Sequence, residues 1–216
     1  MLPPMSSAFS SKQISKRFRG FLPIIVDVET AGFEPKVHAL LEIAAVPVQF
    51  NNVGHLEPTD CIATHVEPFP GSQLDQKALE FNGIDPHHPF RFAKPEKEAL
   101  EHIFKPIRTL LKKHNCTRAI LVGHNPLFDL GFLQAAVERS RIKKNPFHSF
   151  SSFDTATLAG LAFGQTVLAR AVQAAGLEWN EKEAHSAIYD AERTAELFCT
   201  IVNRWDKKVG IGSNGQ

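Results

Sequence analysis

Runs of apolar residues predict four buried β-strands. Residues 21–28 are dense in isoleucine and valine, and residues 40–50 form a second run that contains β-branched residues. Residues 61–66 and 119–122 predict two further, shorter strands. Between the second and third runs, residues 51–54 (Asn-Asn-Val-Gly) are typical of a hairpin turn.

Apolar residues that recur every three or four positions predict helices further along the chain. Residues 100–111 follow Pro95, which can open a helix, and we expect Pro106 to kink or divide that helix. Residues 127–139 and 155–162 predict two more helices. The clearest helical spacing, near the end of the chain, is that of Ile188, Ala191, Ala195, Phe198, Val202 and Trp205. Strands followed by alternating helices and short strands predict an α/β fold, a mixed β-sheet flanked by α-helices.

Length and composition agree with a single folded domain. The chain has 216 residues, of which 43% are apolar and 22% are charged, close to the average for soluble globular proteins. We predict that this domain spans residues 17–206, between a flexible N-terminal arm (1–16) and a flexible C-terminal tail (207–216). No apolar run is long enough to span a bilayer, and residues 1–20 lack the apolar segment of a secretory signal.

Charge and cysteine content narrow the classes of partner. With 24 basic and 23 acidic residues the net charge is +1, so nucleic-acid binding requires a local basic patch. Basic residues cluster within 12–19, 105–118 and 139–144, although solvated helix faces would also explain these clusters. Three widely spaced cysteines argue against a disulfide framework or a thiolate zinc site, so a reducing cytoplasm is the simplest location.

Two acids lie at the end of the first predicted strand. Asp27 and Glu29 are two residues apart, so their side chains point to the same face of the strand. If they are buried together, one takes up a proton unless a cation lies between them, and hard divalent cations with oxygen ligands usually fill such sites. A strand end at which two acids simply meet water would explain the pair as well.

Two more acids are predicted near helix starts. Asp129 follows the polar turn at residues 123–126, and Asp190 lies in the first turns of the last helix, with Ser186 as its N-cap. His185 lies just outside that helix, on a freer segment near the acid. Complementation of the helix dipole would also explain Asp129, and a lone histidine is more often surface or core filler.

Together the four acids can meet at one edge of the sheet. Four carboxylates are unstable as a cluster without metal, whereas with two Mg²⁺ ions about 3.5–4 Å apart they form a phosphoryl-transfer site. Histidine has the intrinsic pKa to take a proton from water at neutral pH, which suits His185 as a base. The sequence therefore predicts metal-assisted phosphoryl transfer.

Three motifs carry a resemblance to a known superfamily. Asp27-x-Glu29, His-Asn-x-x-Phe-Asp ending at Asp129, and His-x-x-x-x-Asp from His185 to Asp190 resemble the exonuclease motifs of the DEDD superfamily, His subtype, which has a ribonuclease H-like fold. Nearly the whole domain is similar to the ribonuclease T family. The segments that carry this similarity are residues 18–21, 28–33, 39–45, 81–86, 145–148, 153–155, 164–167 and 201–205.

The resemblance implies a 3′→5′ exonuclease that trims the 3′ ends of tRNA and other stable RNA, and that also acts on single-stranded DNA. It implies two-metal-ion hydrolysis that releases nucleoside 5′-monophosphates. In that family the residues matching Asp27, Glu29, Asp129 and Asp190 hold two Mg²⁺ ions, for which Mn²⁺ can substitute. The residue matching His185 is the general base.

Four phenylalanines are implied by position to stack on or wedge the terminal bases, namely Phe33, Phe81, Phe128 and Phe150. Most of the 17 phenylalanines must be core, but these four lie in turn-rich segments beside polar residues. Aromatic stacking is worth roughly 1–3 kcal/mol per base, which suits single-stranded nucleic acid. The alternative is that they are phenylalanines at the rim of the core.

The resemblance also implies a nucleic-acid patch far from the metals, formed by Arg17, Arg19, Arg118 and Lys143. In the family this patch serves the active site of the other subunit, so a homodimer is implied. Contacts of this kind make binding salt-dependent.

Two residues leave a question open. Better-known family members carry an acid at the position of Lys77, which helps to set base preference near the 3′ end, whereas here the acid is Glu80. The family's reluctance to remove terminal cytidines is therefore either altered here or restored by Glu80.

Asp154 is interpreted as an N-cap before Thr155 rather than as an acid that supports the site.

Three other functions compete with this hypothesis. A different DEDD exonuclease, such as a proofreading subunit or an oligoribonuclease, shares the chemistry and differs in substrate. A non-catalytic RNA-binding protein on the same fold would be favoured by loss of an acid, but all four acids and His185 are present. An unrelated metal phosphohydrolase would not need the four phenylalanines.

Overall fold

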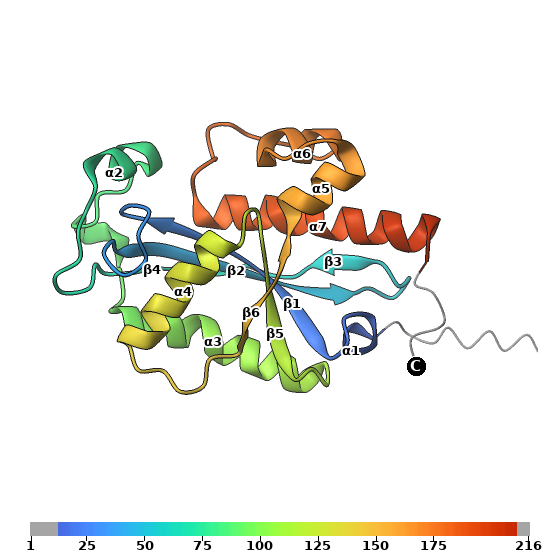
Figure 1. Cartoon of the computed structure of the whole chain (residues 1–216), viewed down its shortest axis with the longest axis horizontal. Helices are drawn as coiled ribbons and strands as arrows, with labels where there is room; N and C mark the ends of the chain where they lie inside the picture. The colour runs from blue at the N-terminus through green and yellow to red at the C-terminus, as the bar shows by residue number, and fades with distance from the viewer. Residues whose placement is uncertain (1–12, 211–216) are drawn as a thin grey trace, which may run out of the picture.

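The computed structural model describes residues 13–210, which form a mixed β-sheet with helices on both faces (Figure 1). The six strands are β1 (Phe21–Thr30), β2 (Leu40–Phe50), β3 (Leu56–Pro58), β4 (Ile62–His65), β5 (Arg118–Gly123) and β6 (Phe147–Asp154). Their order is β3-β2-β1-β5-β6, with β4 also paired to β2. β1 is antiparallel to β2 and parallel to β5, and β5 is parallel to β6. The predicted α/β class is confirmed.

The helices form two layers around this sheet. They are α1 (Ile14–Arg17), α2 (Gln76–Asn82), α3 (Glu96–Lys113), α4 (Leu127–Arg139), α5 (Thr155–Phe163), α6 (Leu168–Ala174) and α7 (Ala187–Lys208), with a 3₁₀ turn η1 (Pro89–Arg91). α7 lies along β1, β2 and β3 on one face, and α3 and α4 lie on the other (Figure 1). None of the helices between residues 13 and 210 combines the length and the apolar character that a bilayer crossing would need.

The two central strands, β1 and β2, are buried and hold the predicted acids Asp27 and Glu29 in fixed positions. β1 and β2 are covered on both faces, so each is a nearly continuous apolar run in the sequence. Within β1, only Asp27 and Glu29 interrupt the buried pattern near the C-terminal end. The two acids therefore stand on a strand that packing holds from both sides.

Two strands (β3 and β6) and three helices (α1, α2 and α6) were not predicted from the sequence. β6 reads Phe-His-Ser-Phe-Ser-Ser-Phe-Asp and is mostly half-buried at the edge of the sheet, so it lacks an apolar run. β3 has only three residues, and α2 and α6 have seven each. The predicted turn at residues 51–54 is confirmed, because the Gly54 N–H donates to the Asn51 carbonyl at 2.9 Å.

We expected Pro106 to kink or divide its helix, and the division is wrong. α3 continues through this proline from Glu96 to Lys113. A proline inside a helix costs about 3 kcal/mol, and here an apolar stripe on both sides of it opposes that cost. The buried stripe consists of Ala99, Leu100, Ile103, Phe104, Ile107 and Leu111.

The folded part extends beyond the predicted limits of 17–206. Ile14 is buried in the main core, and α7 ends at Lys208. The rest of the predicted arm (1–12) and of the predicted tail (211–216) lies outside the described residues.

Candidate active site

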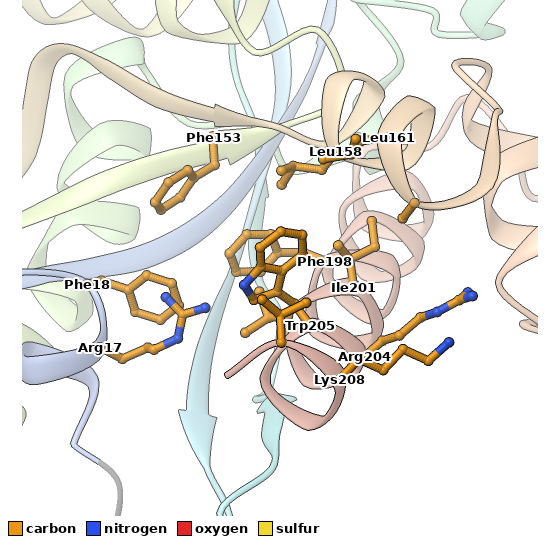
Figure 2. A pocket seen from close by; sticks show the side chains of 13 residues that line it. Arg17, Phe18, Phe153, Leu158, Leu161, Phe198, Ile201, Arg204, Trp205 and Lys208 are labelled. Carbon is orange, nitrogen blue, oxygen red and sulfur yellow. The ribbon is translucent and has the colours of Figure 1, made fainter. Parts of the chain in front are cut away.

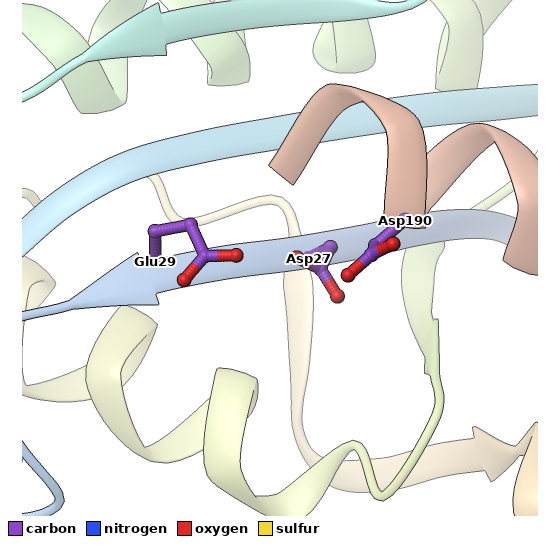
Figure 3. A group of neighbouring side chains, drawn as sticks. All are labelled: Asp27, Glu29 and Asp190. Atoms are coloured by element: carbon purple, nitrogen blue, oxygen red, sulfur yellow. The ribbon is translucent and has the colours of Figure 1, made fainter. Parts of the chain in front are cut away.

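Three carboxylates converge where β1 ends and α7 begins. Asp27 and Glu29 project from the same face of β1, and Asp190 reaches them from the first turn of α7 (Figure 3). One oxygen from each of these three side chains lies within 4.8 Å of the others, a spacing that can hold a metal ion. One buried oxygen of this group, Asp190 Oδ1, accepts no hydrogen bond from any of the described residues.

Asp129 lies beside this trio but takes part in a different contact. It is buried in the first turn of α4, and its Oδ1 accepts the Val28 N–H at 3.1 Å. Val28 stands between Asp27 and Glu29 on β1, so the hydrogen bond fixes Asp129 against the strand that carries them. Of the four predicted acids, the described residues bring three into one ligand group and the fourth next to it.

The environment of the four acids disfavours their ionised forms. Burial, together with Asp129, Asp190 and Glu29, raises the pKa of Asp27 well above its ordinary value. Burial is the largest cause that raises the pKa of Glu29 to about 8 and that of Asp129 to about 8, and burial also raises the pKa of Asp190. A divalent cation would restore the ionised forms, and this oxygen-only set of donors suits Mg²⁺ or Mn²⁺.

His185 lies just outside α7, as predicted. Its backbone is left-handed, with φ of 68°, and its N–H donates to Asp190 Oδ2 at 3.3 Å. The imidazole is exposed and packs against Phe81 with ring centroids 4.3 Å apart. The histidine is therefore tied to the acid through its backbone, while its ring stays accessible from solvent.

A cleft of about 500 Å³ surrounds these groups, and three phenylalanines line it. Phe33 and Phe81 are 81% and 69% exposed, and Phe128 meets Phe33 edge-on with centroids 6.3 Å apart. Phe150 is 77% exposed but projects from β6 and does not line the cleft. Phe128 is less exposed, at 36%, and also packs on the buried Phe132, as a ring at the rim of the core would.

A glycine sets the path of the chain into the cleft. Gly32 has φ of 152°, and a Cβ there would collide with the ring of His38. The Thr30 hydroxyl donates to the Gly32 carbonyl at 2.7 Å, which closes the turn after β1. This turn places Phe33 directly beyond Glu29.

Comparison with known proteins agrees with this geometry. The profile of the RNase_T family, described as an exonuclease, matches residues 24–198. Ribonuclease T of Hahella chejuensis is 59% identical over 203 residues, which cover 94% of this chain and 93% of that protein. Ribonuclease T of Marinobacter nauticus is 59% identical over 198 residues, covering 92% and 90%. The chain belongs to the ribonuclease T family.

Solved structures support the fold at greater distance. Escherichia coli exonuclease I in complex with a dT13 oligonucleotide superposes with a TM-score of 0.64 at 17% identity. The match covers 87% of this chain but 42% of exonuclease I. A zinc-bound form of the exonuclease I–single-stranded DNA complex gives 0.63 at 18% identity. At these identities the likeness concerns the fold alone, and family membership makes the chain an exonuclease, a hydrolase of nucleic acid.

Within this ribonuclease T framework, Lys77 and Glu80 have different positions. Lys77 lines the cleft and is the only lysine or arginine among the described residues that do so. Glu80 is absent from this lining, and its carboxylate accepts a hydrogen bond from Gln76 Nε2 at 3.1 Å. The residue that faces the cleft therefore bears a positive charge, and the nearby acid is engaged elsewhere.

Asp154 is the N-cap of α5, as predicted, and it also holds the loop before α4. Its side chain accepts the N–H groups of Ala156 and Thr157 and, at 3.1 Å, that of Asn125. Burial alone would raise the pKa of Asp154, but these bonds and one from the Thr157 hydroxyl lower it. Through Asn125, which has φ of 65°, the cap supports the turn that leads to Phe128 and Asp129.

The four predicted patch residues gather at the opposite end of the sheet. Arg19 precedes β1, Arg118 begins β5, and Lys143 precedes β6, so all lie where these parallel strands start. Arg17 is also there, but its guanidinium pairs with Asp206 at 3.1 Å. The patch therefore lies at the far end of β1 from Asp27 and Glu29.

Sequence reasoning missed Glu42. This residue of β2 is 7% exposed, and its Oε2 accepts the Ala187 N–H at 3.1 Å. Ser186 is at the N-cap of α7 as predicted, but within residues 13–210 it makes no side-chain capping bond. The signal that could have identified Glu42 is an acid inside the otherwise apolar run 40–48.

Proposed function

We propose that this member of the ribonuclease T family hydrolyses RNA from the 3′ end, with Asp27, Glu29, Asp129 and Asp190 as metal ligands and His185 as general base. The observation that carries the proposal is the carboxylate trio within 4.8 Å beside three phenylalanines that line the same cleft. Acids alone would suit many metal sites. The adjacent aromatic rings favour a substrate that presents unstacked bases.

The metal requirement follows from the acids themselves. Two Mg²⁺ or Mn²⁺ ions, bound by the four carboxylates, would supply the positive charge that stabilises the attacking and leaving oxygens of the phosphodiester. Two observations on the described residues support bound metal ions at this site. Asp190 Oδ1 is buried and accepts no hydrogen bond, and the pKa values of Glu29 and Asp129 are raised.

His185 takes the proton from the attacking water. The water oxygen forms a bond to phosphorus, the bond from phosphorus to the 3′ oxygen of the preceding nucleotide breaks, and that oxygen takes up a proton. A nucleoside 5′-monophosphate leaves, and the RNA ends in a new 3′ hydroxyl. The exposed imidazole lines the same cleft as the carboxylates, which supports this role.

The phenylalanines hold the terminal nucleotides. Phe33, Phe81 and Phe128 would stack on or wedge bases so that the last phosphodiester reaches the carboxylates, and Phe150 would contact nucleotides outside the cleft. Stacking does not depend on the 2′ hydroxyl, which supports single-stranded DNA as a second substrate. A base-paired end cannot enter in this way, so digestion should stop near a duplex.

We also propose a homodimer in which the basic patch serves the partner's active site. An apolar groove of about 500 Å³ lies between α1, β6, α5 and α7 and contains the exposed Leu161, Trp205 and Val209 (Figure 2). β6 is the last strand of the sheet in the described residues, so its outer edge is open to a second copy. Arg17 lines the groove and belongs to the patch, which makes the two surfaces continuous.

Sedimentation of the full chain tests the dimer. Leu161→Asp places a charge in the groove and should convert a dimer to a monomer at micromolar concentration, while the exposed-loop change Asp60→Asn should not. A wild-type monomer, or a Leu161→Asp protein that still sediments as a dimer, would contradict this proposal.

The activity is tested with an RNA hairpin that carries a short single-stranded 3′ tail. Separate 5′-labelled and 3′-labelled samples are incubated with Mg²⁺, with EDTA, and with the Asp27→Ala variant in Mg²⁺. We expect a 5′-labelled ladder that shortens from the 3′ end and stalls near the duplex, absent in both controls. RNA that is bound but stays intact in Mg²⁺ would leave a binding protein on an exonuclease fold.

A further inference from the structure

Glu42 is a buried acid that does not line the cleft but stands directly behind it. It lies on β2, opposite Glu29 of β1 in the antiparallel register, and opposite His65 of β4 on its other side. Residue 42 therefore lies between β1, which carries Asp27 and Glu29, and β4. Its side chain projects to the same face of the sheet as that of Glu29.

The carboxylate of Glu42 accepts the first N–H of α7. Helix N-termini leave N–H groups without intrahelical partners, and a side chain at the N-cap usually accepts one of them. Ser186 does not do so within the described residues, whereas Glu42 Oε2 lies 3.1 Å from the Ala187 nitrogen. Ala187 is fully buried, so water cannot replace this acceptor. A negative charge at this end of the helix also agrees with the helix dipole.

Two basic side chains, His65 and Arg91, lie near Glu42. His65 Nδ1 lies 3.2 Å from Glu42 Oε1. The Arg91 guanidinium lies nearby and donates to the backbone carbonyl of Leu41 at 2.7 Å, next to Glu42 in β2. The hydrogen bond from Ala187 therefore ties Glu42 to the start of α7, with the two basic groups beside it.

The start of α7 carries the groups that the chemistry needs. Asp190 lies in its first turn and supplies the third carboxylate of the trio, and the His185 N–H donates to Asp190 at 3.3 Å. Any shift of this turn relative to β1 changes the distance from Asp190 to Asp27 and Glu29.

We propose that Glu42 is a positioning residue: its carboxylate fixes the first turn of α7 to the sheet and thereby sets the spacing of Asp27, Glu29 and Asp190. The inference rests on the proposed metal-dependent function. A cap that served folding alone would change thermal stability and leave metal affinity and kcat as they are.

Three single variants of the full chain separate these roles. Glu42→Ala removes the acceptor, and Glu42→Gln keeps an oxygen that can accept the Ala187 N–H. The matched control is Glu57→Ala, which removes another strand carboxylate that accepts two hydrogen bonds, from Gln49 and Asn51, away from the cleft. Mn²⁺ binding is measured by calorimetry on the metal-free proteins without RNA, and kcat and KM are measured on a single-stranded RNA with Mg²⁺.

For Glu42→Ala we expect metal affinity to fall about 10- to 100-fold, the usual effect of losing a residue that orients a metal ligand. We expect kcat at fixed subsaturating Mg²⁺ to fall in proportion, with KM for RNA changed less than about twofold because Phe33, Phe81 and Phe128 are untouched. Glu42→Gln should recover most of the affinity. Glu57→Ala should behave as wild type in both assays.

Ala187→Pro removes the same hydrogen bond from the donor side and serves if Glu42→Ala does not fold. Proline fits the first helical position, and Ser186 already has the extended backbone (φ −111°, ψ 127°) that precedes proline. The same loss of metal affinity in this variant supports the inference. Wild-type metal affinity in a folded Glu42→Ala or Ala187→Pro protein overturns it, whereas a wild-type enzyme that neither binds Mn²⁺ nor shortens RNA overturns the proposed function instead.

Discussion

Two hollows in the described surface have similar volumes and opposite chemistry. The cleft at the end of β1 and the groove between α1, β6, α5 and α7 each enclose about 500 Å³. The cleft contains the three converging carboxylates and a single lysine, whereas the groove contains no carboxylate and is lined by apolar residues with Arg17, Arg204 and Lys208. Size therefore does not identify the site of chemistry, and the charge of the lining does.

The different linings also indicate what kind of ligand or surface each hollow can bind. Closely packed acids with raised pKa values would be stabilised in their ionised forms by cations, and the exposed rings beside them offer surfaces on which bases can stack. Exposed Leu161 and Trp205 need cover by another apolar surface. The following predictions test whether the cleft alone carries the reaction.

The largest expected effect comes from Asp27→Asn. The amide has nearly the same shape but cannot supply a charged ligand, so we expect kcat to fall by about 10³-fold or more in Mg²⁺. Single-turnover digestion of a 5′-labelled RNA measures it, with Asp60→Asn on an exposed loop as the control. A decrease in kcat smaller than tenfold would show that Asp27 is not an essential metal ligand.

Phe33→Ala tests the aromatic part of the cleft. Loss of one stacking contact of about 1–3 kcal/mol corresponds to about 5- to 150-fold in kcat/KM. Phe90→Ala is the matched control, because Phe90 is 75% exposed and does not line the cleft. Equal effects of the two changes would show that Phe33 has no special contact with RNA.

Lys77→Glu tests the charge that faces the terminal nucleotides. Tails that end in C and in A are digested side by side, and we expect the ratio of their rates to change about 3- to 10-fold, within the range of one exposed charged contact. Lys97→Glu on α3, outside the cleft lining, should leave the ratio unchanged. An unchanged ratio in Lys77→Glu would place base preference elsewhere.

The smallest expected effect is on stability. Burial raises the pKa of both Glu29 and Asp129 to about 8, against about 4 in an unfolded chain. The folded protein then binds more protons than the unfolded one, so the metal-free protein should lose stability as the pH rises from about 4 to 8. Saturating Mg²⁺ should raise Tm at pH 8 by about 5 °C and flatten this slope, and Glu29→Gln should weaken the pH dependence. A Tm at pH 8 that is the same with EDTA and Mg²⁺ would contradict this picture.

The sequence predicted the secondary structure best where a residue pattern is compatible with only one kind of element. The continuous apolar runs of β1 and β2 predicted those strands, and the helical spacing of apolar residues predicted α7. The positions of Asp27 and Asp190 followed from the ends of these elements. β6 was not predicted because this edge strand, with three serines and a histidine among its eight residues, has no apolar run.

Contacts between distant segments were beyond the sequence. The hydrogen bond from Val28 to Asp129 joins residues 101 positions apart, and that from Ala187 to Glu42 spans 145. Local chemistry indicated Ser186 as the cap of α7, but the sheet supplies the acceptor instead. The separation of Phe150 from the other three rings also depends on where β6 lies in the sheet.

The most direct test of the account is to digest a single-stranded RNA in ¹⁸O-labelled water with Mg²⁺ and to weigh the products. Hydrolysis at the terminal phosphodiester predicts nucleoside 5′-monophosphates from the first turnover, each with one ¹⁸O in its phosphate, and a shortened RNA with an unlabelled 3′ hydroxyl. Oligonucleotide products, 3′-phosphates or mononucleotides without ¹⁸O would contradict hydrolysis from the 3′ end in the acid cleft.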